Sequence, residues 1–163
     1  MNGITQAELR NRVFRDPVKL LAFGLGAGLS PLAPGTCGSI VGVLLAWLCW
    51  PLPLPARIGV GVALVLSGIW LCGEAARRLR VHDHPGIVWD EIAAMYLVLL
   101  TVPLSIGLWA LAFLLFRLFD IWKPWPIRDL DHRLRNGAGI MLDDLTAALY
   151  AALMLGFGRW LMS

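Results

Sequence analysis

Long apolar runs, separated by short polar clusters, set the plan of this chain. Hydrophobic residues dominate positions 38–54, 58–76, 92–119 and 139–157. A helix that spans a bilayer needs about 20 predominantly apolar residues. The runs therefore predict an all-α fold, a polytopic helical membrane bundle in which the few residues between the first two runs form a turn on the outer side.

The run at 92–119 allows two interpretations. As one helix it would place Asp120 on the outer side, whereas two helices that turn at Thr101-Val-Pro103 would return Asp120 to the inner side. Arg117 and the basic cluster behind it favour this hairpin, because basic residues gather on the cytosolic side of membrane proteins. The arms of the hairpin are short, roughly 12 and 16 residues, which implies tilt or local bilayer thinning. About five membrane segments are expected in total.

The composition strengthens the membrane assignment. The chain is 58% hydrophobic and 15% charged, with a mean hydropathy of +0.71, whereas a soluble domain is about 45–50% apolar and about 25% charged. Its 163 residues are expected to form a single domain, 1–163, that begins with a polar arm at 1–15 and has no nucleic-acid partner. Three cysteines without paired spacing suggest neither a disulfide framework nor a zinc site; they are Cys37, Cys49 and Cys72.

The net charge of +3 is small, but the basic residues are unevenly distributed. Apart from Arg57 and Arg159, every Lys and Arg lies before residue 20, within 77–80 or within 117–135. By the positive-inside rule these three groups mark the cytosolic side, and the two isolated arginines mark the opposite side. The charged N-terminal residues do not resemble a cleavable signal peptide, so we expect the N-terminus inside and the C-terminus outside.

This topology brings four polar clusters to the cytosolic side, at 34–39, 82–91, 120–131 and 137–144. Ionisable groups at the mouth of a helical bundle are costly and usually functional. The pairs Asp90-Glu91 and Asp143-Asp144 each place two carboxylates about 100° apart on a helix, where they repel one another unless a cation lies between them. Mg²⁺ prefers such oxygen ligands, together with water and substrate phosphate.

The alternative for each acidic pair is helix capping, since negative charge at a helix N-terminus is favourable by about 0.3–1 kcal/mol. Two pairs together with Asp120 on one side favour a metal site. Asp120 and Lys123 are spaced three apart, on one helix face, just before Pro124, so Lys123 could reach a phosphate while Asp120 holds a metal. The alternative is a surface ion pair or a snorkelling lysine.

Two further clusters are weaker candidates. The segment from Pro34 to Ser39 leads into a helix and offers backbone N–H groups, hydroxyls and a positive helix end, which suits an anion; a membrane-entry turn is the alternative. It lacks the Gly-Lys-Ser/Thr of a Walker A loop. His82 and His84, which flank Asp83, could protonate a leaving alkoxide or bind a phosphate oxygen, or could make structural hydrogen bonds at the interface.

Two apparent phosphatase motifs are rejected. Cys72 and Arg78 have the C-x5-R spacing of cysteine phosphatases, but they lie in a helical run where a phosphate cradle would need glycine-rich backbone. Asp129 and Asp131 form a D-x-D without a preceding apolar strand. Water is therefore the expected nucleophile.

Four ordered motifs resemble the phosphatidylglycerophosphatase A family, a family of bacterial Mg²⁺-dependent lipid phosphatases. The resemblance covers about residues 17–150 and rests on these residues: Gly28-Leu-Ser-Pro31 with Pro34-Gly-Thr36 and Gly38-Ser39; Val81-His-Asp-His84 with Ile87-Val-Trp-Asp90-Glu91; Phe116-Arg117 with Phe119-Asp120-x-Trp-Lys123-Pro-Trp-Pro-Ile-Arg128; and Gly137-x-Gly139-Ile-Met141-x-Asp143-Asp144.

The resemblance implies hydrolysis of phosphatidylglycerophosphate to phosphatidylglycerol and phosphate at the cytosolic face of the inner membrane. One or two Mg²⁺ would lie among the carboxylates and activate water for in-line attack. The residues it implies are Asp90, Glu91, Asp120, Asp143 and Asp144 as metal ligands; Lys123, Arg128, Asp83, Thr36, Gly38 and Ser39 at the substrate; and His82 or His84 as the general acid. The closing helix departs from the family pattern at Ala147-Ala148, where Ala-Gly is expected.

Two other function classes remain open at this point. Another phospholipid phosphotransfer enzyme, such as a CDP-alcohol phosphotransferase, needs D-G-x2-A-R, which this sequence lacks. A divalent-cation transporter or channel could also carry acidic pairs in a bundle, but its carboxylates should lie at the membrane midplane. Here they are expected at helix ends on one side, which favours surface chemistry.

Overall fold

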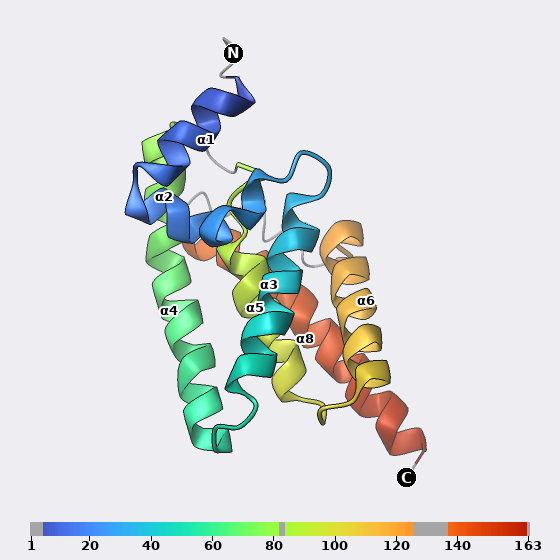
Figure 1. The fold of residues 1–163 in the computed structure, drawn as a ribbon. Coiled ribbons are helices and arrows are strands. Elements are labelled where there is room, and N and C mark those ends of the chain that lie inside the picture. The colour runs from blue at the N-terminus through green and yellow to red at the C-terminus, as the bar shows by residue number, and fades with distance from the viewer. Residues whose placement is uncertain (1–4, 82–83, 126–136, 163) are drawn as a thin grey trace.

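The computed structural model describes residues 5–81, 84–125 and 137–162, and within these ranges all regular secondary structure is helical. The all-α prediction is therefore confirmed. The elements in chain order are α1 (Gln6–Phe14), α2 (Pro17–Ala22), the 3-10 helix η1 (Gly24–Leu29), α3 (Pro34–Cys49), α4 (Leu54–Leu79), α5 (Trp89–Leu100), α6 (Ile106–Trp122) and α8 (Gly137–Leu161) (Figure 1).

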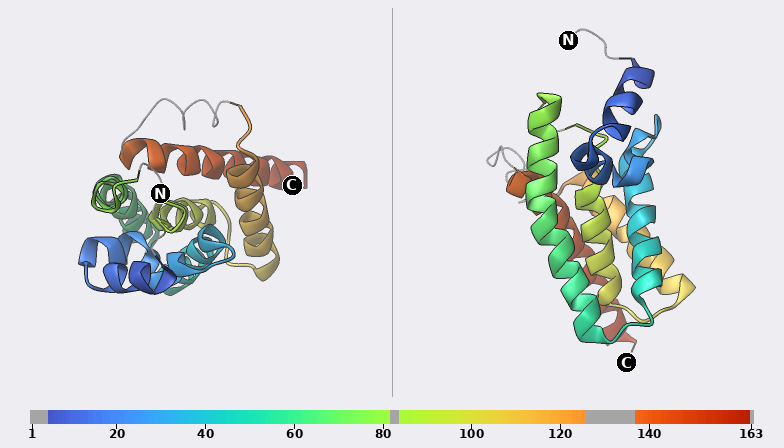
Figure 2. Two further views of the ribbon diagram at one scale, coloured as in Figure 1. Left: turned by 90° about the horizontal axis from the view of Figure 1, so that it is seen from above. Right: turned by 60° about the vertical axis from the view of Figure 1, so that its left-hand side comes forward.

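Helix α5 is the central helix of the bundle. It packs against α3, α4, α6 and α8, while α1, α2 and η1 cover one end of the molecule (Figure 2). Residues 92–96 of α5 are buried on every side. A helix that is apolar on all sides is usually buried in a core. This explains why α5, with 12 residues, is surrounded by longer helices.

Close contact between α3 and α5 depends on two glycines spaced four apart. A Cβ atom at Gly38 would lie 2.7 Å from the Cβ of Val88, and one at Gly42 would lie 2.7 Å from the carbonyl oxygen of Ile92. Small residues at this spacing let helix backbones approach in membranes. The first turn of α3 is thereby brought next to the first turn of α5.

The crossing of α4 and α8 is also close. The backbone of Gly137 lies against Ile69 and Gly73, where a Cβ atom at Gly73 would be 3.2 Å from the Gly137 Cα. Further along, the indole N–H of Trp89 donates a 3.0 Å hydrogen bond to the carbonyl oxygen of Leu64, tying α5 to α4. These contacts fix where the start of α8 lies relative to α5.

The predicted hairpin is confirmed. Helix α5 ends at Leu100, α6 begins at Ile106, and the indole N–H of Trp109 donates a 3.1 Å hydrogen bond to the carbonyl oxygen of Pro103 in the connection. The side chain of Val102 is buried in the same turn. The chain therefore reverses between these helices and returns Asp120 to the end where α5 starts.

The predicted apolar runs correspond to α3, α4, the α5–α6 hairpin and α8, but the five expected membrane segments are supported only in part. Two helices, α4 and α8, are long and apolar enough to cross a bilayer, while α3 is a shorter apolar helix. Large apolar side chains are exposed along the outer faces, as a lipid-facing surface would require; examples are Trp47, Leu66, Trp70, Leu114 and Leu153.

The N-terminal region is more regular than expected. The predicted polar arm folds as α1, which Thr5 and Glu8 start with a reciprocal capping box, and Val13 is fully buried. Helix α3 begins at Pro34, four residues before the apolar run predicted to start near Gly38. Proline is favoured in the first turn of a helix, so the expected anion loop forms the first turns of α3 instead.

Candidate metal centre and phosphate site

Three carboxylates from two helices meet beside the first turn of α5. One oxygen each from Asp90 and Glu91 of α5 and from Asp144 of α8 lies within 4.8 Å of the other two. Asp90 and Asp144 are only 7% and 4% exposed. The structure thus brings together members of both acidic pairs that the sequence singled out.

The helix contacts explain this convergence. The Val88 N–H donates a 2.9 Å hydrogen bond to the carbonyl oxygen of Ala22, which together with the Trp89 indole bond holds the start of α5 against α2 and α4. The glycine crossing of α4 and α8 sets the position of Asp144. Three tertiary contacts, rather than local sequence, therefore fix the distance between the carboxylates.

The donor set fits a divalent cation. The Glu91 Oε2 and Asp144 Oδ2 atoms are buried and have no hydrogen-bond partner within the described ranges. Burial disfavours a charged carboxylate, and neighbouring carboxylates repel one another unless a cation compensates. Carboxylate oxygens are hard donors of the kind that Mg²⁺ binds, commonly one or two of them together with water and phosphate oxygens.

The other two predicted ligands lie beside this cluster in ion pairs. Lys123 Nζ is 2.5 Å from Asp143 Oδ2, and Arg117 binds Asp120 through its Nη1 atom. The Asp120 carboxylate also interacts electrostatically with the carboxylates of Glu91 and Asp144. The expected five-carboxylate site is thus a cluster of three flanked by two acid–base pairs.

Among the described residues, the ion pair between Asp120 and Lys123 that was the alternative to a metal and phosphate role is replaced by pairs with other residues. Lys123 follows the last residue of α6 and adopts a left-handed conformation with φ of 45°. Its side chain crosses to α8, while Arg117, three residues before Asp120, takes the place of its helical partner. Each aspartate thus forms an ion pair with a different cation, and the predicted role of Lys123 at a phosphate stays a prediction.

Sequence reasoning missed Arg117 as a site residue. Its side chain is 15% exposed, and a Cβ atom at Gly35 would lie 3.0 Å from its Nη1 atom and would overlap Glu91 Oε1. Arg117 thus joins the start of α3 to the acidic cluster. The available signal was its three-residue spacing from Asp120 within an otherwise apolar helix.

The predicted anion segment contributes mostly packing contacts. Ser39 is fully buried, and its hydroxyl donates a 2.9 Å hydrogen bond to the carbonyl oxygen of Gly35. Gly38 contacts Val88, and Thr36 is half-buried at the end of an apolar groove. Gly35, which was not singled out, is the member of this segment that contacts the acidic cluster.

Of the two predicted histidines, His84 lies within the described residues, in the turn before α5. Its Nδ1 atom accepts a 3.0 Å hydrogen bond from the Gly86 N–H, and its ring lies 5.4 Å from that of Phe23. Because Nδ1 accepts, the neutral ring carries its proton on Nε2. The other predicted substrate or acid residues, His82, Asp83 and Arg128, lie outside the described residues.

The position of Cys72 argues against a cysteine-phosphatase site, as the sequence predicted. It lies inside α4 with its side chain fully buried. A nucleophilic thiolate needs an electropositive, accessible pocket, and the charged neighbours of Cys72 are the acidic residues Asp90, Glu91 and Asp144.

Comparisons with known proteins agree with the motifs. The sequence model of a family described as phosphatidylglycerophosphatase A matches residues 20–159. Two proteins called phosphatidylglycerophosphatase A are similar to this chain: one from Escherichia coli (strain K12), 41% identical over 87% of this chain and 83% of the relative, and one from Haemophilus influenzae, 44% identical over 86% and 87%.

A third relative, from Bacteroides thetaiotaomicron, is 34% identical over 88% of this chain and 94% of its own length. It carries the provisional name of a phosphatidylinositol-3-phosphatase. No solved structure matches the chain.

Proposed function

The chain belongs to the phosphatidylglycerophosphatase A family of phosphatases, and on this premise we propose that it hydrolyses phosphatidylglycerophosphate to phosphatidylglycerol and phosphate with Mg²⁺ held by Asp90, Glu91 and Asp144. The observation that carries the proposal is the meeting of these three carboxylates within 4.8 Å, with Asp90 and Asp144 buried. Their adjacency to two paired cations suits a phosphate substrate.

The proposed reaction is displacement at phosphorus by water. The water oxygen forms a new bond to phosphorus, the bond between phosphorus and the glycerol oxygen breaks, and that oxygen takes up a proton to become the terminal hydroxyl of phosphatidylglycerol. When bound, Mg²⁺ supplies charge neutralisation for the phosphate and activation of water. The role of His82 or His84 as proton donor stays a prediction.

The cations beside the cluster have a defined part in this scheme. Arg117 carries a planar set of N–H donors that can bind two phosphate oxygens at once, and Asp120 holds it in place. Lys123 acts as a point charge held by Asp143. The first turn of α3 adds backbone N–H groups, since the initial N–H groups of a helix have no partner within it.

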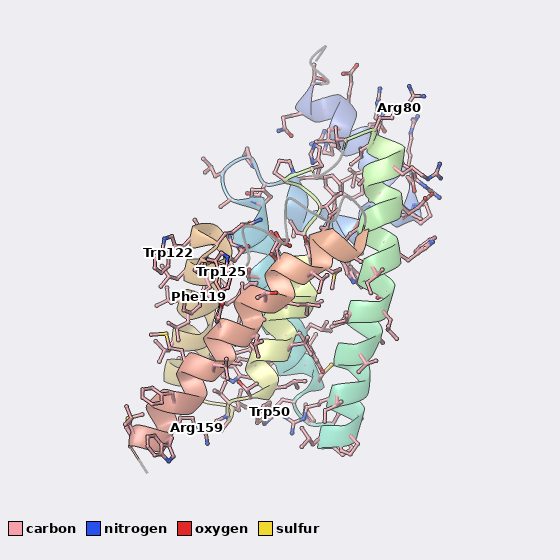
Figure 3. All side chains as sticks on the ribbon, turned by 180° about the vertical axis from the view of Figure 1, so that it is seen from behind. Trp50, Arg80, Phe119, Trp122, Trp125 and Arg159 are labelled. Carbon is pink, nitrogen blue, oxygen red and sulfur yellow. The ribbon has the colours of Figure 1, made fainter. Side chains whose placement is uncertain are left out.

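We place the site at the cytosolic face of a bacterial inner membrane. Arg80 and Arg159 lie at opposite ends of the molecule (Figure 3), and the larger basic groups of α1, α2 and the end of α4 share the Arg80 end. The positive-inside rule therefore supports a cytosolic location for that end. Trp50 and Arg57, stacked 4.3 Å apart, suit the opposite interface.

A cation transporter is disfavoured by the same geometry. Transport sites lie near the bilayer midplane between helices that can open to both sides. Asp90 and Glu91 lie in the first turn of α5, and the residues that follow them along that helix are apolar and mostly buried. This arrangement supports chemistry at one surface.

The test is phosphate release by the purified protein in detergent micelles. Phosphatidylglycerophosphate is compared with phosphatidylinositol 3-phosphate and phosphatidic acid, using wild type and the Cys72→Ala and Asp144→Asn variants. We expect the first lipid to be hydrolysed fastest, Cys72→Ala to remain active and Asp144→Asn to be inactive. Faster hydrolysis of the inositol lipid would replace the proposed substrate, and activity that needs Cys72 would contradict the metal mechanism.

A further inference from the structure

A large apolar groove lies between α3 and α6 on the side of the bundle away from α4. Its volume is about 600 Å³, within the range of about 300–1,000 Å³ typical of ligand pockets. Both helices pack on α5, the central helix of the bundle (Figure 1). Trp109 is a buried wall residue, while Leu44, Ala110 and Leu114 are exposed and leave the groove open sideways.

Both walls of the groove end at the acidic cluster. On α3 the last lining residue is Thr36, next to Gly35, which touches Glu91 and Arg117. On α6 the last lining residue is Leu114, three residues before Arg117 and therefore on the same helix face. From Thr36 to Leu44 the groove follows eight residues of α3, or about 12 Å at 1.5 Å per residue.

We propose that this groove binds one acyl chain of the lipid substrate while the phosphate lies at the carboxylate cluster. The inference rests on the proposed function, because it takes a phospholipid as the substrate. Apart from Thr36 the lining side chains are apolar, so a hydrocarbon chain gains contacts there without leaving polar groups unpaired. The polar end at Thr36 meets the glycerol and phosphate part of the same molecule.

A smaller hollow of about 220 Å³ between α5 and α8 is the competing position for the chain. It starts at Leu145, next to Asp144, and reaches Thr101 at the far end. The α3–α6 groove is favoured because it is larger and because Arg117, the proposed phosphate ligand, continues one of its walls.

The experiment compares two substrates that share a headgroup. Wild type and variants are assayed on long-chain phosphatidylglycerophosphate and on its deacylated form, glycerophosphoglycerophosphate, and the ratio of the two kcat/KM values is the readout. Ala110→Leu and Ala110→Trp fill the groove by increasing amounts. Ala63→Trp, on an exposed position of α4, is the matched control, and Ala152→Trp fills the smaller hollow.

We expect wild type to favour the long-chain lipid, and Ala110→Trp to lower the ratio about tenfold, equivalent to about 1.4 kcal/mol, with a smaller effect of Ala110→Leu and none of Ala63→Trp. An unchanged ratio in both Ala110 variants, equal wild-type activity on both substrates, or a fall confined to Ala152→Trp would overturn the groove assignment while leaving the phosphatase intact. Wild type that hydrolyses neither substrate would overturn the proposed function itself.

Discussion

Gly35 in the first turn of α3 lies directly against Glu91 in the first turn of α5. A methyl group at position 35 would overlap the Glu91 Oε1 atom and lie 3.0 Å from Arg117 Nη1. The absence of a side chain at Gly35 therefore permits a carboxylate and a guanidinium to share one small space. The close contact of α3 with α5 therefore affects the position of Glu91 and Arg117 as well as the packing of the two helices.

Replacing Gly35 with alanine should displace Glu91 while leaving the fold intact. A displacement of about 1 Å in a catalytic group can cost about 100-fold in rate, so we expect a loss of that order in kcat/KM. The control is Gly59→Ala, because no atom lies within 4 Å of its added methyl group. Full activity of Gly35→Ala, with a melting temperature equal to that of Gly59→Ala, would contradict the assigned contact.

Mg²⁺ should stabilise the protein against heat through the acidic cluster. A ligand at 100 times its Kd adds about 2.7 kcal/mol to folding stability, whereas without a cation the three carboxylates repel one another. Wild type should therefore melt at a higher temperature in Mg²⁺ than in EDTA, and Asp144→Asn should melt higher than wild type in EDTA alone. If the melting temperature of wild type is the same in Mg²⁺ and in EDTA, the acidic cluster does not bind Mg²⁺.

Variants of Lys123 and Asp143 should show whether Lys123 has a catalytic role or only a structural one. Lys123→Met leaves the 9% exposed Asp143 carboxylate without this partner, and the added Asp143→Asn change should recover stability, with a coupling energy of about 0.5–3 kcal/mol. Turnover should not recover in the double variant, because Lys123 is proposed to bind phosphate. Arg77→Met is the control, since Arg77 forms an ion pair while 73% exposed.

If turnover and melting temperature return together in the Lys123 and Asp143 double variant, the lysine acts only as a structural partner. Its role at the phosphate would then be withdrawn. The same double-variant cycle thus decides between the two interpretations that the sequence left open for this residue.

Asp16 should make the docking of α1 and α2 sensitive to acid. Partial burial acts to raise the pKa of Asp16, but hydrogen bonds from Lys19 and the charges of Lys19 and Arg78 lower it overall. A carboxyl with a lowered folded-state pKa adds stability that is full above its unfolded pKa of about 3.9 and is lost as pH falls through the folded value. Protease cleavage within α1 and α2 should therefore rise below about pH 4.

Asp16→Asn is the informative variant in that experiment. Asparagine caps a helix nearly as well as aspartate, so the start of α2 is kept while the 2.8 Å ion pair with Arg78 is lost. We expect more cleavage than in wild type at neutral pH and a weaker dependence on pH. An unchanged pH profile would show that another group controls the docking.

The sequence was sufficient for the apolar helices of the bundle and for singling out the acidic residues, but not for the helical N-terminal region. Apolar runs marked α3, α4 and α8, and the basic residues around Arg117 predicted the turn between α5 and α6. Adjacent carboxylates at residues 90–91 and 143–144 were recognised because such pairs are costly in an apolar chain. Each of these signals is local along the chain.

Which carboxylates meet could not be predicted in the same way. Asp143 and Asp144 are neighbours in sequence, yet one pairs with Lys123 and the other joins Asp90 and Glu91. That division depends on the crossing of α4 with α8, where Gly73 and Gly137 touch. The role of Arg117 was hidden for the same reason, because its partner Gly35 lies far away in sequence.

The most direct test of the three-carboxylate site is the Mg²⁺ dependence of phosphate release from phosphatidylglycerophosphate in wild type, Asp144→Asn and Glu8→Gln. Glu8 is an exposed carboxylate on α1, so its variant controls for the loss of one negative charge. We expect release by wild type and Glu8→Gln that stops in EDTA and returns with Mg²⁺, and none by Asp144→Asn at any Mg²⁺ concentration. Release by wild type in EDTA, or by folded Asp144→Asn at the wild-type rate, would contradict the site.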